Sequence, residues 1–267
     1  MDIPLPWERL LWRGRPAWPV LPRERYAALV NVLLVDPELR TLIFVRTRAD
    51  ASEVAGRLSA DGFRAGALSG ELAQAERTRM LDAFRQGTLA VLACTDVAAR
   101  GIDVPEVGRV VHAELPDNPE LLTHRSGRTG RAGRKGVSIL LVPAPQFRFA
   151  ENLLRGANVR AELLPAPSPR DVLKRRDERL FEELTKSDES EEAPRSASLP
   201  LLTQRLIEAL GAEATVEALL QRLQAQGPCA PLPITEVNKT EPPARRPSFA
   251  RPESRVPERR PRHMQRR

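Results

Sequence analysis

The sequence has only two cysteines and no long apolar run. Cys94 lies in an apolar segment and Cys229 in a proline-rich one, far away in the chain, so the pair predicts neither a disulfide framework nor a metal site. No apolar stretch approaches the ~20 residues that a membrane span requires. Residues 1–18 carry proline and charge where a signal peptide needs an unbroken apolar segment. These absences predict a soluble protein of the reducing cytoplasm without a membrane partner.

Aromatic residues are also scarce, at 4%, and leucine, alanine and valine carry most of the 41% apolar content. That composition suits helices packed on a parallel sheet better than an aromatic-rich β-sandwich. A chain of 267 residues can hold one sizeable domain and a smaller satellite. The formal net charge of +7 favours a polyanionic partner. We therefore expect an α/β protein with an anionic ligand.

Short apolar runs alternate with amphipathic stretches from residue 26 to about residue 160. The expected strands are TLIFV (41–45), RAGAL (64–68), LAVLAC (89–94), GRVVHAEL (108–115) and GVSILLV (136–142), and the expected helices span 49–60, 71–85, 119–126 and 145–155. Strands separated by helices pair in parallel through right-handed crossovers, so helices should cover both faces of the sheet. Ligands of such sheets bind outside the carboxyl ends of the strands. We expect the functional site in the loops after Val45, Leu68, Cys94 and Glu114.

The composition divides the chain into four parts. We expect a linker over residues 1–25, the α/β domain over 26–164, a helical extension over 165–226 with an acidic linker at 186–198, and a disordered Pro/Arg-rich tail over 227–267. In the tail, ten basic residues against four acidic ones leave +6 of the net +7. Such a tail is a candidate for sequence-independent phosphate contact, or else it only keeps the protein in solution.

Two apolar stripes mark the helical extension. One contains Leu202, Leu206 and Leu210, and the other contains Val216, Leu219, Leu220 and Leu223. Helices this short are not stable alone in water, so the stripes must pack on something. Two explanations stay open: the stripes pack on each other or on the α/β domain, or they form the surface of a homodimer.

The segment THRSGRTGRAGRKG, residues 123–136, has an arginine at every third position: Arg125, Arg128, Arg131 and Arg134. A collagen-like tract is excluded because the glycine period is short and contains no proline. A solvated basic tail is excluded because the apolar run GVSILLV follows at once and predicts a buried strand. The arginines therefore indicate anion chemistry, either in a loop that holds phosphates or in the completion of another module's active site.

Four segments together resemble the second RecA-like lobe of DEAD-box ATP-dependent RNA helicases. They are TLIFVRTR, SGELAQAERTRMLDAFRQG (69–87), VLACTDVAARGIDVPEV (91–107) and HRSGRTGRAG (124–133). They occur in the order and spacing of that lobe, and the resemblance covers roughly residues 27–142. It implies a RecA-like parallel sheet with helices on both faces, RNA and ATP as ligands, and an N-terminal RecA-like lobe as partner.

The resemblance assigns roles around ATP. Arg128 and Arg131 would be arginine fingers that neutralise charge on the transferred phosphoryl group, since a guanidinium stays charged and offers a planar fork to phosphate oxygens. Gly101 and Asp103 would contact the ATP ribose. The residues implied in contact with the other lobe, or in shaping the loop that faces it, are His124, Arg125, Asp96 and Arg100.

The resemblance also assigns contacts to the RNA backbone, at Arg46, Thr47, Gly70, Gln74, Arg77 and Thr95. Backbone amides at a helix N-terminus bind phosphate without reading sequence, which suits an enzyme indifferent to base identity. The chain departs from the family pattern at two places. Ser69-Gly70-Glu71 stands where the family has His-Gly-Asp, and Glu114 stands where aspartate is commoner.

Several family motifs have no counterpart in the sequence. It contains no Gly-x-x-x-x-Gly-Lys-Ser/Thr loop, no Asp-Glu-Ala-Asp box and no Gln motif. Those motifs belong to the lobe that grips ATP and Mg²⁺, so we expect the metal to be held there, with no metal ligand in this chain and no activity from this lobe alone. Two alternatives stay open: an ATP-independent RNA-binding and oligomerising protein derived from a helicase, and a DNA helicase of the same superfamily.

Overall fold

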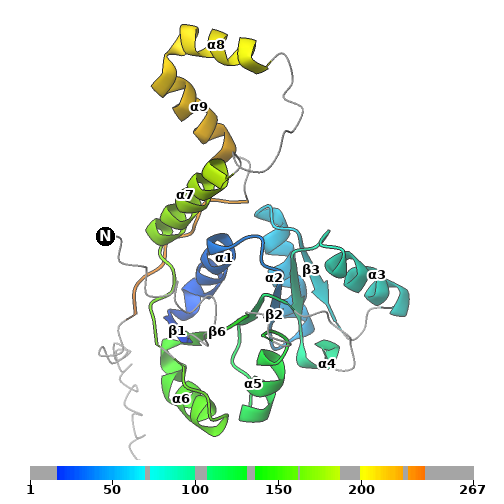
Figure 1. Ribbon diagram of the computed structural model, residues 1–267. Coiled ribbons are helices and arrows are strands. Elements are labelled where there is room, and N and C mark those ends of the chain that lie inside the picture. The colour runs from blue at the N-terminus through cyan, green and yellow to red at the C-terminus, as the bar shows by residue number, and fades with distance from the viewer. Residues whose placement is uncertain are drawn as a thin grey trace, which may run out of the picture.

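The computed structural model describes residues 17–69, 73–99, 107–130, 136–161, 163–186, 199–224 and 228–237. A twisted sheet lies at the centre of the lower body in Figure 1, with helices on both of its faces, and three further helices rise above it. The sheet body carries the candidate site. The helices above it correspond to the extension expected from the sequence.

The sheet has six strands in the order β1-β6-β5-β2-β4-β3, and every pairing is parallel. The strands are β1 (Ala17–Val20), β2 (Thr41–Phe44), β3 (Ala65–Leu68), β4 (Val91–Cys94), β5 (Arg109–His112) and β6 (Val137–Pro143). Five of them fall on the five predicted apolar runs. The α/β class with a parallel sheet is confirmed.

Strand residues alternate between two apolar cores, one on each face of the sheet. Ile43 and Val45 of the β2 segment pack under α1 (Arg25–Val35) and α2 (Arg48–Ala60), whereas Leu42 and Phe44 face α3 (Gln74–Arg85). On that second face, α5 (Pro119–Ser126) and α6 (Phe147–Gly156) pack over β6. The short helix α4 (Asp96–Ala99) follows β4 directly. Burial on both faces explains why the strands read as continuous apolar runs.

Register aligns the carboxyl ends of the central strands. Phe44 pairs with Cys94 on one side and with His112 on the other. The residues that follow these three strands therefore meet at one edge of the sheet, where ligands of parallel sheets bind. The loops expected to form the site are thus brought together by strand pairing.

The first strand differs from the expected linker over 1–25. Ala17 to Val20 pair with β6, and Trp18 is fully buried. Pro19 fits there because an edge strand leaves one side of its backbone without a ladder partner. The segment AWPV is too short and too proline-rich to predict as a strand, and only its pairing with β6 reveals it.

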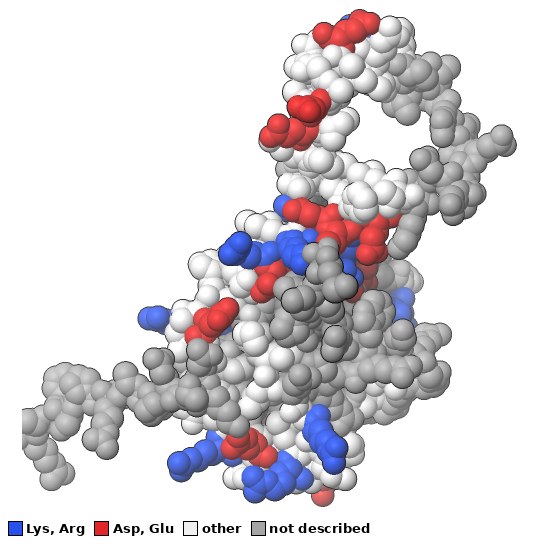
Figure 2. Space-filling view, turned by 60° about the vertical axis from the view of Figure 1, so that its left-hand side comes forward, with Lys and Arg blue, Asp and Glu red and all other residues white. Residues whose placement is uncertain are grey.

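The extension consists of α7 (Pro169–Lys186), α8 (Leu199–Leu210) and α9 (Ala212–Gln224). Helix α7 packs on α1, where Arg179 donates to the Leu34 carbonyl and lies 4.0 Å from the Asp36 carboxylate. Helices α8 and α9 form an arm that projects from the body (Figure 1) and turns at Gly211, whose φ is +83°. In Figure 2, charged side chains gather below the arm, whereas much of the arm is uncharged. Residues 187–198 of the expected acidic linker lie outside the described residues.

The chain after residue 227 also differs from the expected disordered tail. Residues 228–237, which we call the strap, lie against the sheet body, and Cys229, Leu232 and Ile234 pack on the core beneath α1 and α2. Residues 238–267 lie outside the described residues. Among the described residues, no helix is both long and apolar enough to cross a membrane.

Stability is expected to fall at alkaline pH because of Cys94. Burial raises the pKa of its thiol from 9.0 to about 12. The unfolded chain therefore loses this proton near pH 9 while the folded chain keeps it. The stability that the folded protein owes to the buried, protonated thiol is complete below pH 9. It is lost as pH rises from 9 to 12, at up to about 1.4 kcal/mol per pH unit.

Urea unfolding at several pH values between 7.5 and 10.5 checks this expectation. Cys94→Ala should lower stability at pH 7.5 through the lost packing, and the difference from the wild type should shrink as pH rises above 9, because the variant has no thiol whose ionisation favours the unfolded chain. Parallel declines for the wild type and Cys94→Ala would contradict the assignment.

Candidate functional site

The arginine-rich loop is held by the helix before it and by the strand beside it. Helix α5 begins with Asn118, whose Oδ1 accepts from the Leu121 amide at 2.8 Å, and Pro119 occupies the first turn. After its last turn, the Arg128 carbonyl accepts from the Val107 amide at 3.2 Å, and the Thr129 hydroxyl donates back to the Val107 carbonyl. The backbone at Arg128 is therefore hydrogen-bonded to the segment just before β5.

A cleft of about 230 Å³ lies between α4 and α5 at the carboxyl edge of the sheet. It is lined by Phe44, Asp96, Ala99, Leu121, His124, Arg125 and Arg128. Two arginines and one aspartate thus face a hollow next to the end of β2. The cleft contains three of the four residues that we expected to face another lobe and one of the two expected arginine fingers.

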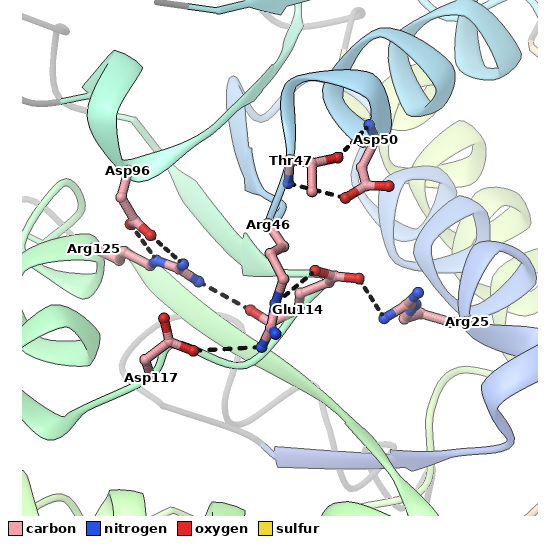
Figure 3. Close-up of polar contacts among 8 residues, drawn as sticks. All are labelled: Arg25, Arg46, Thr47, Asp50, Asp96, Glu114, Asp117 and Arg125. Carbon is pink, nitrogen blue, oxygen red and sulfur yellow. Dashed lines mark hydrogen bonds and ion pairs between the residues drawn. The ribbon is translucent and has the colours of Figure 1, made fainter.

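Arg125 is the rigid member of this cleft. Its Nε and Nη2 each donate to an Asp96 carboxylate oxygen at 2.6 Å, and Nη1 donates to the Glu114 carbonyl at 2.9 Å (Figure 3). The guanidinium also lies 5.0 Å from the centre of the Phe44 ring, and the residue is 4% exposed. We expected Arg125 to contact the other lobe and Asp96 to shape the loop with Arg100, which lies outside the described residues. In this structure Arg125 pairs with Asp96 and joins α4 and the segment after β5 to α5.

Arg128 and His124 are the more accessible polar side chains of the cleft. His124 is exposed, Arg128 is half-buried, and Arg128 donates from Nη2 to the Ala99 carbonyl at 3.3 Å. This contact places the Arg128 guanidinium at the end of α4. Arg131, Gly101, Asp103, Arg100 and Gly70 lie outside the described residues, so their expected roles stay predictions.

A second charged group lies at the same edge of the sheet. Glu114 accepts from Arg25 Nη1 at 3.1 Å and lies 3.7 Å from Arg46 Nε, while Arg46 Nη2 contacts Asp117 at 3.4 Å (Figure 3). Arg46 remains 66% exposed on its side chain. Glu114, the residue that departs from the family pattern, therefore organises two arginines and leaves one of them open to solvent.

The expected RNA contacts at Thr47 and Thr95 lie at two helix starts on this edge. Thr47 caps α2, where its hydroxyl accepts from the Asp50 amide at 3.1 Å and its own amide donates to the Asp50 carboxylate at 2.9 Å. Thr95 caps α4, where its hydroxyl accepts from the Ala98 amide at 3.4 Å. These hydroxyls fix the two helix N-termini at the place where phosphate is expected.

The other expected RNA contacts lie on α3. Arg77 donates from Nη2 to the Ala98 carbonyl at 3.0 Å and so joins α3 to α4, and Gln74 is exposed in the first turn of α3. The structure therefore brings Arg46, Thr47, Thr95, Gln74 and Arg77 to helix starts and strand ends of one sheet. Arg77 also supports the loop that carries Asp96.

A buried polar layer beneath α5 was missed in the sequence. His112 Nε2 lies 3.0 Å from Ser138 Oγ, which lies 2.9 Å from Ser126 Oγ, and all three residues are almost completely buried. The layer joins β5 and β6 to the last turn of α5, two residues before Arg128. The available signal was the presence of His112 and Ser138 within the apolar runs GRVVHAEL and GVSILLV. Among the described residues, no group of three or more His, Cys, Asp or Glu side chains could hold a metal.

Comparison with known proteins matches residues 24–133 to the helicase conserved C-terminal domain. The chain is 43% identical over 127 residues to DEAD-box ATP-dependent RNA helicase 9, mitochondrial, of Arabidopsis thaliana, which covers 48% of this chain and 21% of that protein. It is 34% identical over 170 residues to the DEAD-box ATP-dependent RNA helicase CshA of Bacillus cereus, covering 63% of this chain and 32% of that one. The chain thus matches a fifth to a third of the length of these relatives. Because one of them is mitochondrial, the cytoplasmic location inferred from the cysteines stays a prediction.

Solved structures agree with the sequence matches. The C-terminal domain of the DEAD-box protein Dbp5 superposes with a TM-score of 0.55 at 30% identity, covering 62% of this chain and 97% of that one. A DEAD box protein from the hyperthermophile Methanococcus jannaschii gives a TM-score of 0.54 at 36% identity, covering 57% of this chain and 42% of that one. The chain belongs to the DEAD-box RNA helicase family, and its sheet body is the C-terminal RecA-like lobe of that family.

Proposed function

We propose that this lobe binds the RNA backbone and supplies arginine side chains to ATP held by a second, ATP-binding lobe. The observation that carries the proposal is the cleft between α4 and α5, where Arg128 projects beside a rigid Arg125–Asp96 pair. A cleft of this kind on one lobe offers arginine side chains to a phosphate at a fixed position. The metal would be held by the ATP-binding lobe.

The proposed role in ATP hydrolysis depends on a positive charge, that of Arg128, which is already in position before ATP arrives. Arg128 keeps its charge at any physiological pH and carries a planar fork of donors. Its backbone is tied to Val107, so little reorganisation is needed when a phosphate arrives. Arg131 would act as the second finger, with Gly101 and Asp103 at the ribose and His124 against the ATP-binding lobe.

The RNA side rests on helix starts and an exposed arginine. The capped N-termini of α2 and α4 and the exposed Arg46 lie at one edge of the sheet. Phosphate is attracted to both kinds of group, and neither reads base identity. Gly70, Gln74 and Arg77 would extend this path, and the basic residues of 238–267 would add salt-sensitive contacts of the same kind.

A two-lobe fusion tests the proposal. The ATP-binding lobe of a DEAD-box relative joined to this chain should hydrolyse ATP, and single-stranded RNA should stimulate the hydrolysis more than DNA of the same sequence does. A folded fusion that binds RNA without hydrolysing ATP would support the ATP-independent alternative. Stronger stimulation by DNA would support the DNA-helicase alternative.

We also propose that the arm formed by α8 and α9 is the surface of a homodimer. The side chains of Leu202, Leu210, Val216 and Leu219 are each about half exposed although they are apolar. The two helices pack on each other through only part of their surface, with Thr215 donating to the Leu206 carbonyl. A second copy of the same arm offers matching apolar stripes, which suits an isologous contact.

Light scattering is expected to give the mass of a dimer for the full chain. Leu202→Glu combined with Leu219→Glu should give a monomer, because each change places a charge on the apolar surface. Ala214→Glu is the control, since residue 214 lies on α9 about 200° around the helix from Val216. A monomeric wild type, or a double variant that stays dimeric, would contradict the proposal.

A further inference from the structure

The strap crosses the sheet body along the outside of α1 and α2. Its contacts reach residues more than 160 positions earlier in the sequence: the Cys229 amide donates to the Asp61 carbonyl at 2.9 Å, and Thr235 donates from its amide and its hydroxyl to the Glu24 carboxylate at 2.7 and 3.0 Å. Pro228 lies against Gly62, where an added Cβ would come within 3.3 Å of the Pro228 Cα. Both ends of the strap are therefore attached to the body.

Asn31 holds the middle of the strap. Its side-chain amide donates to the Leu232 carbonyl at 2.9 Å, and its side-chain carbonyl accepts from the Leu232 amide at 2.8 Å. The same amide group donates to the Pro167 carbonyl at 2.9 Å, and the residue is completely buried. A buried asparagine that pairs with both backbone groups of one residue recognises a main chain, because its side-chain amide offers one donor and one acceptor to the N–H and C=O of that residue.

The strap presents one apolar face to the body. Cys229, Leu232 and Ile234 pack on the core, whereas Ala230 and Pro233 are exposed. Three prolines, at 228, 231 and 233, favour an extended backbone and remove amides that would need partners. The segment is thus pre-organised for docking, which lowers the entropy lost when it binds.

We propose that the surface between α1 and α2 is a peptide-binding groove, and that the strap is its ligand within the same chain. The groove recognises an extended proline-rich peptide through main-chain hydrogen bonds to Asn31 and Asp61, three apolar side chains, and a hydroxyl residue opposite Glu24. A peptide of the same pattern binds it in trans when the strap is displaced. This site lies on the face of the sheet opposite the α4–α5 cleft and uses none of the residues assigned to ATP or RNA.

In the full chain, the reaction rate of the Cys229 thiol indicates whether the strap is docked on the body. The only other cysteine, Cys94, is completely buried, so a thiol reagent such as DTNB should react with Cys229 in the folded protein. Leu232→Asp should raise this rate at least about tenfold, since it replaces a partly buried leucine that packs on the core with a charged side chain. Ala230→Asp adds the same charge at an exposed position of the same segment and should change the rate less than about twofold. Far-ultraviolet circular dichroism establishes that both variants keep the fold of the body.

A peptide added in trans tests the groove itself. A fluorescent peptide of residues 228–237 should bind the Leu232→Asp chain saturably. It should bind the wild type at least about tenfold more weakly, because the strap of the wild type competes for the groove at a high effective concentration. Adding Asn31→Leu to the Leu232→Asp chain should abolish most of this binding. A peptide that itself carries Leu232→Asp is the negative control.

Three outcomes would overturn the proposal. They are equal Cys229 rates in the two strap variants, a peptide that does not bind the Leu232→Asp chain, and protection of Cys229 that disappears on dilution of the wild type. The last would mean that the strap docks on a neighbouring copy and not on its own body. Neither measurement involves RNA or ATP, so these outcomes leave the proposed function of the lobe untouched.

Discussion

Arg128→Ala is expected to lower RNA-stimulated ATP hydrolysis by the two-lobe fusion about 10³-fold or more, the scale of an arginine finger in phosphoryl transfer. The guanidinium and its contact with the Ala99 carbonyl are lost, but the bonds of the Arg128 carbonyl and of the Thr129 hydroxyl to Val107 are kept and should hold the loop in place. RNA affinity, measured by fluorescence anisotropy, should change little. The two measurements together separate a loss of chemistry from a loss of binding.

Two companion variants sharpen the Arg128 result. Arg128→Lys keeps the charge but replaces the planar fork with a point charge, so activity should recover only in part. Arg134→Ala removes another arginine of the same repeat, one to which the resemblance assigns no role, and should keep most of the activity. If Arg128→Ala retains more than about a tenth of the wild-type rate in a folded fusion, Arg128 does not serve as an arginine finger.

Asp96→Asn is expected to destabilise the lobe by roughly 3–5 kcal/mol, the usual cost of removing one partner from a buried ion pair. The guanidinium of Arg125 would keep its charge at a position that is 4% exposed, with only part of its hydrogen bonding satisfied. Because the pair joins α4 and the segment after β5 to α5, the cleft that contains Arg128 should loosen as well. Urea denaturation at neutral pH measures the loss.

Asp82→Asn is the matched control for this experiment. Asp82 pairs with Arg85 at 3.0 Å on the surface of α3, where both side chains are more than a third exposed. The same change of charge there should cost less than about 1 kcal/mol. Equal losses of unfolding free energy in Asp96→Asn and Asp82→Asn would contradict the expectation that the buried Arg125–Asp96 pair stabilises the lobe more than a surface pair does.

The resemblance in the sequence named residues of the cleft, and the structure shows which two of them pair. It named Asp96, Arg100 and Arg125 as residues near the other lobe, and the structure joins Asp96 to Arg125. These residues are separated by 29 positions in the chain. No local pattern indicates which arginine takes the carboxylate, since that depends on how α5 lies over the ends of β4 and β5.

The polar layer beneath α5 could not have been predicted for the same reason. His112, Ser126 and Ser138 occur singly in three different elements, and each by itself is compatible with many environments. Parallel pairing of β5 with β6 places His112 close to Ser138, and α5 then covers both. Their contact is a product of tertiary packing.

The sequence by itself determined the α/β class, the positions of five strands and the bounds of α5, because the period of apolar residues is a local property that burial on a sheet imposes directly. It also placed Arg125 and Arg128 shortly before the last strand of the sheet, since their spacing and that strand are contained in one segment. Only the tertiary structure decided that residues 17–20 form an edge strand and that residues 228–237 dock beside Asn31. Both segments are short and proline-rich. The free energy that holds them in place comes from contacts with partners more than 100 residues away, so their own composition does not predict where they lie.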